Sequence, residues 1–170
     1  MSQQSTDLAS PLPEALSVLA AISEVSRNRE LAVASAESLT GGLLSSHLAA
    51  AEGASEWFRG GLVAYARSVK HEVLGVPEGP VVSARAAARM AVGVRQLLRA
   101  DYAVAVTGAG GPDSQDGRPP GTVYIGTVGR SGRQNIELVE LDADPQEVLR
   151  QTVLRALEAL LTCMEAGELR

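Results

Sequence analysis

Residues 31–44 constrain the fold of this chain more than any other stretch. Residues 31–34 (Leu-Ala-Val-Ala) form a short run of small and branched apolar residues, which is typical of a buried strand. The run stops at residues 35–38 (Ser-Ala-Glu-Ser), and from Leu43 onward apolar residues repeat at helical spacing. The pattern predicts a strand, a tight turn and a helix, with Ser38 and two glycines in the turn.

This turn has two interpretations. Backbone N–H groups at a helix start are unpaired and can hold a phosphate or an oxyanion. Gly41 and Gly42 would let a ligand approach the backbone closely, and Ser38 would lie where a hydroxyl nucleophile is useful. Alternatively, Thr40 caps the helix, the glycines form the turn and Ser38 is an ordinary loop serine. The spacing leaves both interpretations open.

The rest of the chain alternates helical and strand patterns. Helices are expected to begin at the Ser10-Pro11 start signal, at residue 66 for a short segment to residue 74, at Ser83 and at Asp144. Further strands are expected at residues 60–65, 102–107, 122–128 and 135–141, the last two as a hairpin. This order predicts an α/β fold with helices on both sides of a mixed sheet. We expect a disordered tail at residues 1–9 and a single domain at residues 10–166.

A glycine- and proline-rich loop at residues 108–121 begins where the predicted strand 102–107 ends. Open α/β sheets hold their ligands at such strand ends. The loop does not match Gly-x-Gly-x-x-Gly, because position 113 is Asp, and no Gly-Lys-Ser/Thr follows as in a P-loop. The loop is therefore a candidate ligand site outside the common nucleotide-binding motifs.

Composition excludes several classes of protein. The chain is 45% hydrophobic but has only one Trp, one Phe and three Tyr, so its core must consist of Ala, Val and Leu in tight helix-on-sheet packing. A net charge of −5 argues against a nucleic-acid-binding surface, which needs a basic excess. The single Cys163 excludes an internal disulfide, and His47 and His71 have no metal-ligand spacing, so we expect neither metal nor cofactor.

Targeting signals are not recognised either. No stretch approaches the roughly 20 apolar residues of a membrane span. The N-terminus lacks the positive and apolar regions of a signal peptide. We therefore expect a cytoplasmic protein without a membrane partner.

Four separated blocks of sequence resemble one known family. Residues 36–42 (Ala-Glu-Ser-Leu-Thr-Gly-Gly) are similar to the Ala-Glu-Ser-Cys-Thr-Gly-Gly signature of the CinA C-terminal domain family, the competence/damage-inducible proteins. Similar blocks follow in the family's order at residues 60–65, 103–112 and 121–126. Together the resemblance covers roughly residues 13–163, nearly the whole chain.

The resemblance implies a fold and an activity. The fold would be a three-layer α/β/α sandwich, and the protein would be a homodimer. Stand-alone members act as nicotinamide-nucleotide amidohydrolases, so the implied activity is hydrolysis of nicotinamide mononucleotide to nicotinic acid mononucleotide and ammonia, without a metal. Two alternatives stay open, namely a catalytically silent nucleotide-binding module and an interaction protein in competence or damage response.

The resemblance also suggests the catalytic residues. Ser38 would be the nucleophile, because the family's turn is built around that serine. No histidine suits a Ser-His-Asp triad, so Lys70 would be the base if burial lowers its pKa. Tyr65 would relay the proton or orient the amide. The alternative for Lys70 is an ordinary surface lysine.

A second group of residues is expected to bind the substrate, mostly through backbone N–H groups. Its members are Glu37, Thr40, Gly41, Gly42, Thr107, Gly108 and Arg118. The threonines and glycines would supply backbone donors for the oxyanion, and the substrate phosphate would lie near the glycines or near Arg118. Glu37 would bind the amide nitrogen or a ribose hydroxyl, or would form a salt bridge.

The chain departs from the family pattern at several of these places. Leu39 replaces the usual cysteine, and Ala66-Arg67 replaces a common Ser-Asn. Pro145 and Leu149 occupy positions where arginines are common. If those arginines hold the substrate phosphate, their loss favours the silent-module alternative.

Overall fold

The strands form one mixed five-stranded sheet. A computed structural model describes residues 11–167, and the sheet order is β2-β1-β3-β4-β5. The two pairings of β1 are parallel, and those of β4 are antiparallel. The strands are β1 (Val33–Glu37), β2 (Phe58–Val63), β3 (Tyr102–Gly108), β4 (Thr122–Val128) and β5 (Gln134–Glu140).

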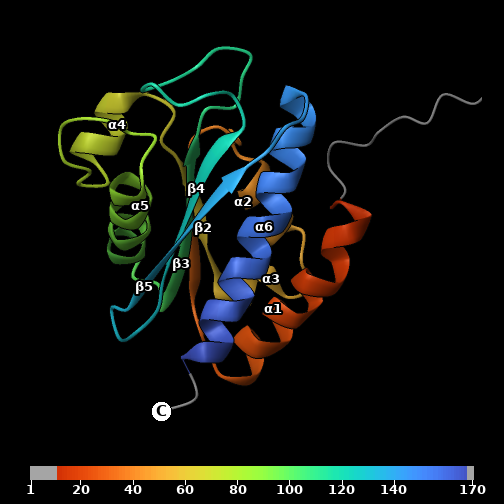
Figure 1. Cartoon of the computed structure of the whole chain (residues 1–170). Coiled ribbons are helices and arrows are strands. Elements are labelled where there is room, and N and C mark those ends of the chain that lie inside the picture. Colours follow the sequence, from red (N-terminus) through yellow and green to blue (C-terminus); the bar gives the residue numbers. More distant parts are fainter. Residues whose placement is uncertain (1–10, 168–170) are drawn as a thin grey trace, which may run out of the picture.

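Helices cover both faces of this sheet (Figure 1). One face carries α1, α2, α3 and α6, and the other carries α4 and α5. The expected three-layer α/β/α sandwich is thereby confirmed. The helical elements are η1 (Pro13–Ala15), α1 (Leu16–Asn28), α2 (Leu43–Ala49), α3 (Ala54–Trp57), α4 (Arg67–Glu72), α5 (Ala84–Leu97) and α6 (Pro145–Ala166).

Several boundaries differ from the expected ones. The first strand, β1, begins at Val33 and continues through Glu37, so the predicted strand 31–34 was placed too early. The strand includes polar residues because their side chains find partners; Ser35 Oγ, for example, lies 3.0 Å from Ser45 Oγ. The first helical turn begins at Pro13, later than the expected start signal. Ser10 and the expected tail at residues 1–9 lie outside the described residues.

The two faces of the sheet pack with side chains of different size. On the α6 face, Val104 and Val106 belong to a core of large aliphatic residues. On the α5 face, Ala103 and Ala105 occupy the alternate positions of the same strand. A Cβ added to Gly126 of β4 would lie 2.6 Å from the carbonyl oxygen of Ala87 in α5, so helix and strand backbones nearly touch. This packing confirms the expected core of small and branched aliphatic residues.

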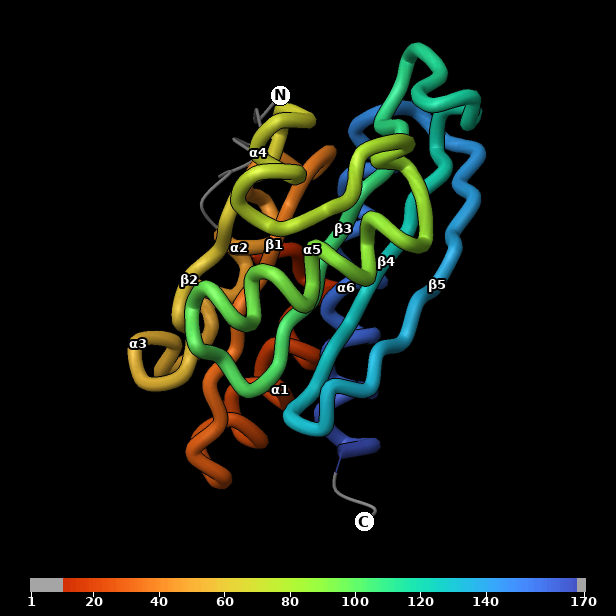
Figure 2. Tube along the Cα trace, turned by 90° about the vertical axis from the view of Figure 1, so that its left-hand side faces the viewer, coloured from red at the N-terminus to blue at the C-terminus, as the bar shows by residue number. Residues whose placement is uncertain are grey.

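The strand order creates a position suited to ligands. The chain runs from β1 to β2 on one side and then crosses to β3 on the other side of β1. The connections that follow β1 and β3 therefore lead toward opposite edges of the sheet. The crevice between the carboxyl ends of two such strands is where doubly wound sheets bind ligands. Figure 2 shows the loops after these strands at the same end of the molecule. Among the described residues, no helix combines the length and the apolarity that crossing a membrane requires.

Candidate active site

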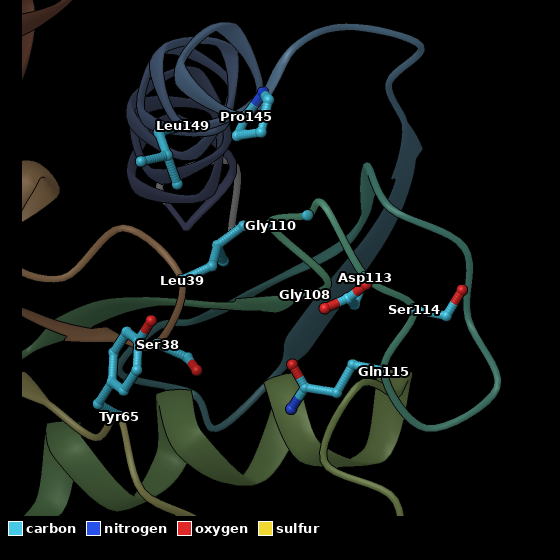
Figure 3. A pocket seen from close by; sticks show the side chains of 11 residues that line it. Ser38, Leu39, Tyr65, Gly108, Gly110, Asp113, Ser114, Gln115, Pro145 and Leu149 are labelled. Atoms are coloured by element: carbon cyan, nitrogen blue, oxygen red, sulfur yellow. The ribbon is translucent and has the colours of Figure 1, made fainter.

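A pocket of about 420 Å³ opens at the carboxyl ends of β1 and β3 (Figure 3). Three segments contribute most of its wall: the turn after β1, the loop after β3 and the first turns of α6. The lining residues are Ser38, Leu39, Tyr65, Gly108, Gly110, Gly111, Asp113, Ser114, Gln115, Pro145 and Leu149. The pocket thus brings together the expected Ser38, Tyr65 and Gly108 from three distant parts of the sequence.

Two backbone hydrogen bonds hold Ser38 directly after the end of β1. Its N–H donates to the carbonyl of Val106 in β3 at 3.1 Å, and its carbonyl accepts from the N–H of Gly41 at 3.1 Å. The residue is 8% exposed, and its hydroxyl forms no hydrogen bond with any other described residue. The backbone is therefore fixed while the hydroxyl is available to a molecule in the pocket.

Glu37 has a different role from the expected ones. Its fully buried carboxylate accepts hydrogen bonds from Thr40 Oγ1 at 2.6 Å, from the N–H groups of Gly42 and Leu44 at 3.1 and 3.0 Å, and from Ser45. Ser45 donates both its N–H, at 2.8 Å, and its hydroxyl. A carboxylate is favoured there because the N-terminus of a helix presents unpaired N–H groups and a positive dipole end.

The backbone N–H groups of the two glycines at positions 41 and 42, which were expected to bind an anion, are therefore already hydrogen-bonded within the protein. Gly42 donates to Glu37, and Gly41 donates to the Ser38 carbonyl. Thr40 does not cap the helix, because the capping position is Gly42 in a left-handed conformation (φ 111°) and the threonine hydroxyl donates to Glu37. Neither the substrate-binding role of Glu37 nor its salt bridge is supported by these contacts.

Other backbone donors are available in the pocket. Leu39, Gly110 and Gly111 line it, and their N–H groups form no hydrogen bond with the described residues. The N–H that follows a nucleophile is a common oxyanion donor in serine hydrolases. No sequence pattern points to these groups, because a free N–H can be recognised only when all other backbone pairings are known.

Lys70 is not a surface lysine. It lies in α4, is 1% exposed, and its Nζ donates to the carbonyl of Tyr65 at 3.0 Å. Burial lowers the pKa of Lys70 and nearby Arg67 lowers it further, while Asp116 acts in the opposite direction. Tyr65 is 73% exposed and lines the pocket. Lys70 is not among the lining residues, but its Nζ is hydrogen-bonded to one of them, Tyr65.

Two other expected substrate-binding residues are engaged elsewhere. The hydroxyl of Thr107 is buried and donates to the carbonyl of Val81 at 2.7 Å. The guanidinium of Arg118 lies over the ring of Tyr124, 5.7 Å from its centroid, and Arg118 is not among the lining residues. Gly108, by contrast, lines the pocket as expected.

Asp116 is a structural residue without a recognisable sequence signal. From the loop after β3 its carboxylate accepts from the N–H groups of Val81 and Val82 at 2.7 and 2.9 Å and from the guanidinium of Arg67. Burial raises the pKa of Asp116, but these hydrogen bonds outweigh burial and leave it below its ordinary value. An Asp-Gly pair signals a turn, but no local pattern points to partners about 35 residues away.

Three of the positions that depart from the family pattern lie together. Leu39, Pro145 and Leu149 all line the pocket. A Cβ added to Gly110 would lie 3.5 Å from Leu39 Cβ and 3.9 Å from Leu149 Cδ2, so these two leucines flank the same glycine. Asp113 is the only charged side chain among the lining residues. No group of three or more His, Cys, Asp or Glu side chains with the geometry of a metal site occurs within residues 11–167.

The fold and the pocket define an α/β/α sandwich protein whose candidate ligand site lies at a topological switch point. The family model for the CinA C-terminal domain matches residues 16–164, and the chain belongs to that family. A "CinA-like protein" from Frankia casuarinae is 45% identical over 148 residues, which are 84% of this chain and 33% of that protein. A "putative competence-damage inducible protein" from Levilactobacillus brevis is 36% identical, over 85% of this chain and 36% of that protein.

Solved structures agree with this assignment over nearly their whole length. A competence/damage-inducible protein from Agrobacterium tumefaciens has a TM-score of 0.85 and 32% identity, covering 91% of this chain and 98% of that one. A CinA superfamily protein from Enterobacter cloacae has a TM-score of 0.84 and 29% identity, covering 96% and 98%. The chain spans about a third of the length of the two curated relatives described above.

Proposed function

We propose that this chain is a serine amidohydrolase that releases ammonia from a pyridine carboxamide, with nicotinamide mononucleotide as the reference substrate. The observation that carries the proposal is the unpaired hydroxyl of Ser38, which lines a pocket beside the unpaired N–H groups of Leu39 and Gly110. A nucleophile next to oxyanion donors is the minimal equipment for hydrolysing an amide. The family resemblance supplies the carboxamide as the substrate class.

The proposed reaction proceeds through an acyl-enzyme. Ser38 Oγ attacks the carboxamide carbon while its proton passes through a water to neutral Lys70. The N–H groups of the pocket stabilise the tetrahedral oxyanion, which collapses and expels ammonia after Lys70 returns the proton. A water then hydrolyses the ester, which gives the carboxylic acid and regenerates Ser38. The lowered pKa of Lys70 supports this role, because only the neutral amine accepts a proton.

Tyr65 has two parts with separate roles in this proposal. Its backbone carbonyl accepts from Lys70 Nζ and so holds the base next to the pocket. Its exposed ring lines the pocket, where a planar pyridine ring would pack against it. The ring is thus proposed to orient the amide rather than to relay a proton.

The experiment that tests the proposal is ammonia release by the purified protein and by Ser38→Ala. Wild-type turnover that is lost in the variant, with an unchanged circular dichroism spectrum and melting temperature, is the expected result. The variant should lose at least about 1,000-fold in kcat, as serine hydrolases do without their nucleophile. Full activity of the variant would remove Ser38 from the mechanism.

A second candidate function is a catalytically silent nucleotide-binding module. It is favoured by Pro145 and Leu149, which line the pocket in place of the family's arginines. This alternative predicts thermal stabilisation by a nucleotide with no ammonia from any carboxamide. The two functions are separated by the same assay run beside a thermal-shift titration.

A further inference from the structure

The pocket has two chemically different sides. Around Ser38 and Tyr65 it presents hydroxyl groups, and across from them Asp113, Ser114 and Gln115 add hydrogen-bonding groups (Figure 3). The side formed by the start of α6 is apolar, where Pro145 and Leu149 face the loop after β3 together with Leu39. A substrate with its amide at Ser38 therefore has a polar side and an apolar side available for the rest of the molecule.

None of the lining residues is a cation, and the arginines nearest in the sequence have other partners. Arg67 pairs with Asp116, and Arg118 lies over the ring of Tyr124. Arg150, which follows Leu149 directly, pairs with Glu147 at 2.7 Å and with Glu14 at 3.1 Å. The one charge on the wall is the carboxylate of Asp113, which repels an anion.

A phosphate monoester is poorly suited to such a wall. In the proposed reaction the free N–H groups of the pocket bind the oxyanion, so the apolar side offers a phosphate neither a cation nor a side-chain donor. Moving an anion from water to such a surface is unfavourable, and a neighbouring carboxylate increases the cost. A pyridine nucleoside without phosphate carries a cationic ring and hydroxyl groups. Its ring would face Asp113 and Tyr65, and its hydroxyl groups would reach Gln115 and Ser114.

We propose that the preferred substrate is a pyridine nucleoside carboxamide without a phosphate, and that Pro145 and Leu149 set this preference. The inference rests on the proposed amidase function and narrows its substrate class. The charge and polarity of the lining residues support this preference. The residues proposed to perform the reaction, Ser38 and Lys70, are the same for both substrates.

The direct test compares kcat/KM for ammonia release from nicotinamide riboside and from nicotinamide mononucleotide. The riboside should be favoured by at least about tenfold, the scale on which a pocket discriminates through a single group. Equal values, or preference for the mononucleotide, would overturn the proposal.

A matched pair of variants tests the role of the apolar wall. Leu149→Arg introduces a cation at the start of α6, and Leu149→Gln introduces a neutral polar side chain at the same place. The arginine variant should shift the ratio of the two kcat/KM values toward the mononucleotide by about tenfold, and the glutamine variant should leave that ratio close to wild type. If a folded arginine variant keeps the wild-type ratio, the wall does not determine the preference and the proposal fails.

Binding separates this inference from the proposed reaction. If neither compound yields ammonia, the amidase function fails, and dissociation constants from isothermal titration calorimetry of the wild type decide the specificity. Tighter binding of the riboside supports the inference in the absence of turnover. Tighter binding of the mononucleotide, equal affinities or no binding of either compound overturns it.

Discussion

At the scale of single residues, Lys70 and Glu37 are the two most completely buried charged residues within residues 11–167. Lys70 is 1% exposed and donates to a single backbone carbonyl, whereas Glu37 is fully buried and accepts from several donors. A buried charge is costly unless it is compensated by hydrogen bonds or neutralised by a pKa shift. Glu37 is compensated by the start of a helix, and Lys70 responds through its lowered pKa.

Lys70→Met should reduce kcat/KM by about 100-fold or more, the usual contribution of a general base. In the wild type, kcat/KM should rise with pH through the lowered pKa of Lys70, because the neutral amine accepts the proton from Ser38. A pH profile for both proteins checks this. The role of Lys70 as base would be excluded if the variant kept the same rising limb.

The same lysine predicts how stability depends on pH. The folded-state pKa lies below the unfolded value of about 10.4, so between the two the unfolded chain binds more protons. The free energy of unfolding of the wild type, relative to Lys70→Met, should therefore increase with pH across this window. Urea unfolding at neutral and at alkaline pH measures the difference, and a decrease would contradict the assignment.

Glu37→Gln should lower the free energy of unfolding by about 2 kcal/mol, because a carboxylate oxygen is replaced by an amide NH₂ facing N–H donors. The variant should also release ammonia more slowly, because a displaced turn after β1 would move Ser38. The control is Glu52→Gln, whose side chain is 84% exposed in an ion pair with Arg27 and should change stability by less than about 0.5 kcal/mol. Equal decreases in the free energy of unfolding for both variants would show that the buried hydrogen bonds of Glu37 do not stabilise the fold more than a surface ion pair does.

At the scale of elements, the pocket depends on how closely helices approach the sheet. The α5 face of β3 carries alanines, and β4 places Gly126 against the backbone of Ala87. The short distance between α5 and the sheet follows from these small residues. The other face holds the larger side chains that seat α6, whose first turns supply the apolar wall of the pocket.

Gly126→Ala should lower the free energy of unfolding by about 1–3 kcal/mol, because the new Cβ would lie 2.6 Å from the carbonyl oxygen of Ala87. The matched control is Gly110→Ala, where the nearest atom would be an ordinary 3.5 Å away and the cost should stay below about 1 kcal/mol. Chemical denaturation of both variants gives the comparison. If both variants lowered the free energy of unfolding by a similar amount, α5 would be able to move away from the sheet without destabilising the fold.

At the scale of the whole molecule, the site is assembled from segments far apart in the sequence. The strand order β2-β1-β3 brings the turn after β1 beside the loop after β3, and α6 closes the pocket from the end of the chain. Asp116 ties the loop after β3 to Val81 and Val82, which precede α5. The homodimer stays a prediction, with both edge strands carrying a partly exposed aliphatic side chain, Val63 and Leu138.

Asp116→Asn should lower the free energy of unfolding by about 1–3 kcal/mol at neutral pH, since a charged acceptor of several hydrogen bonds is lost. The folded-state pKa of Asp116 is depressed, so its contribution is present above the ordinary value of about 3.9 and is lost as pH falls through the lower folded pKa. The gap between wild type and variant should therefore narrow in acid. A gap that is constant down to pH 2 would contradict a role for the ionised carboxylate.

Local pattern was sufficient for much of the fold. The hairpin, predicted at residues 122–128 and 135–141, and the helix start at Asp144-Pro145 follow from turn, capping and alternation rules, and both are present. The expectation of a core built mainly from Ala, Val and Leu was also correct, because a chain with five aromatic residues has few alternatives. The predicted strand 31–34 was wrong at both ends, because the pairing of β1 with two neighbours overrides local preference.

The sequence by itself determined the class of fold, the family and the turn that carries Ser38, because these depend on periodicity and on short motifs. Only the tertiary structure decided which polar groups remain available to a ligand. Glu37 turned out to occupy the helix start, Arg118 to lie on Tyr124, and Leu149 to line the pocket. The physical reason is that a hydrogen bond or a pocket wall joins groups that are close in space, and no local pattern records which distant partner satisfies them.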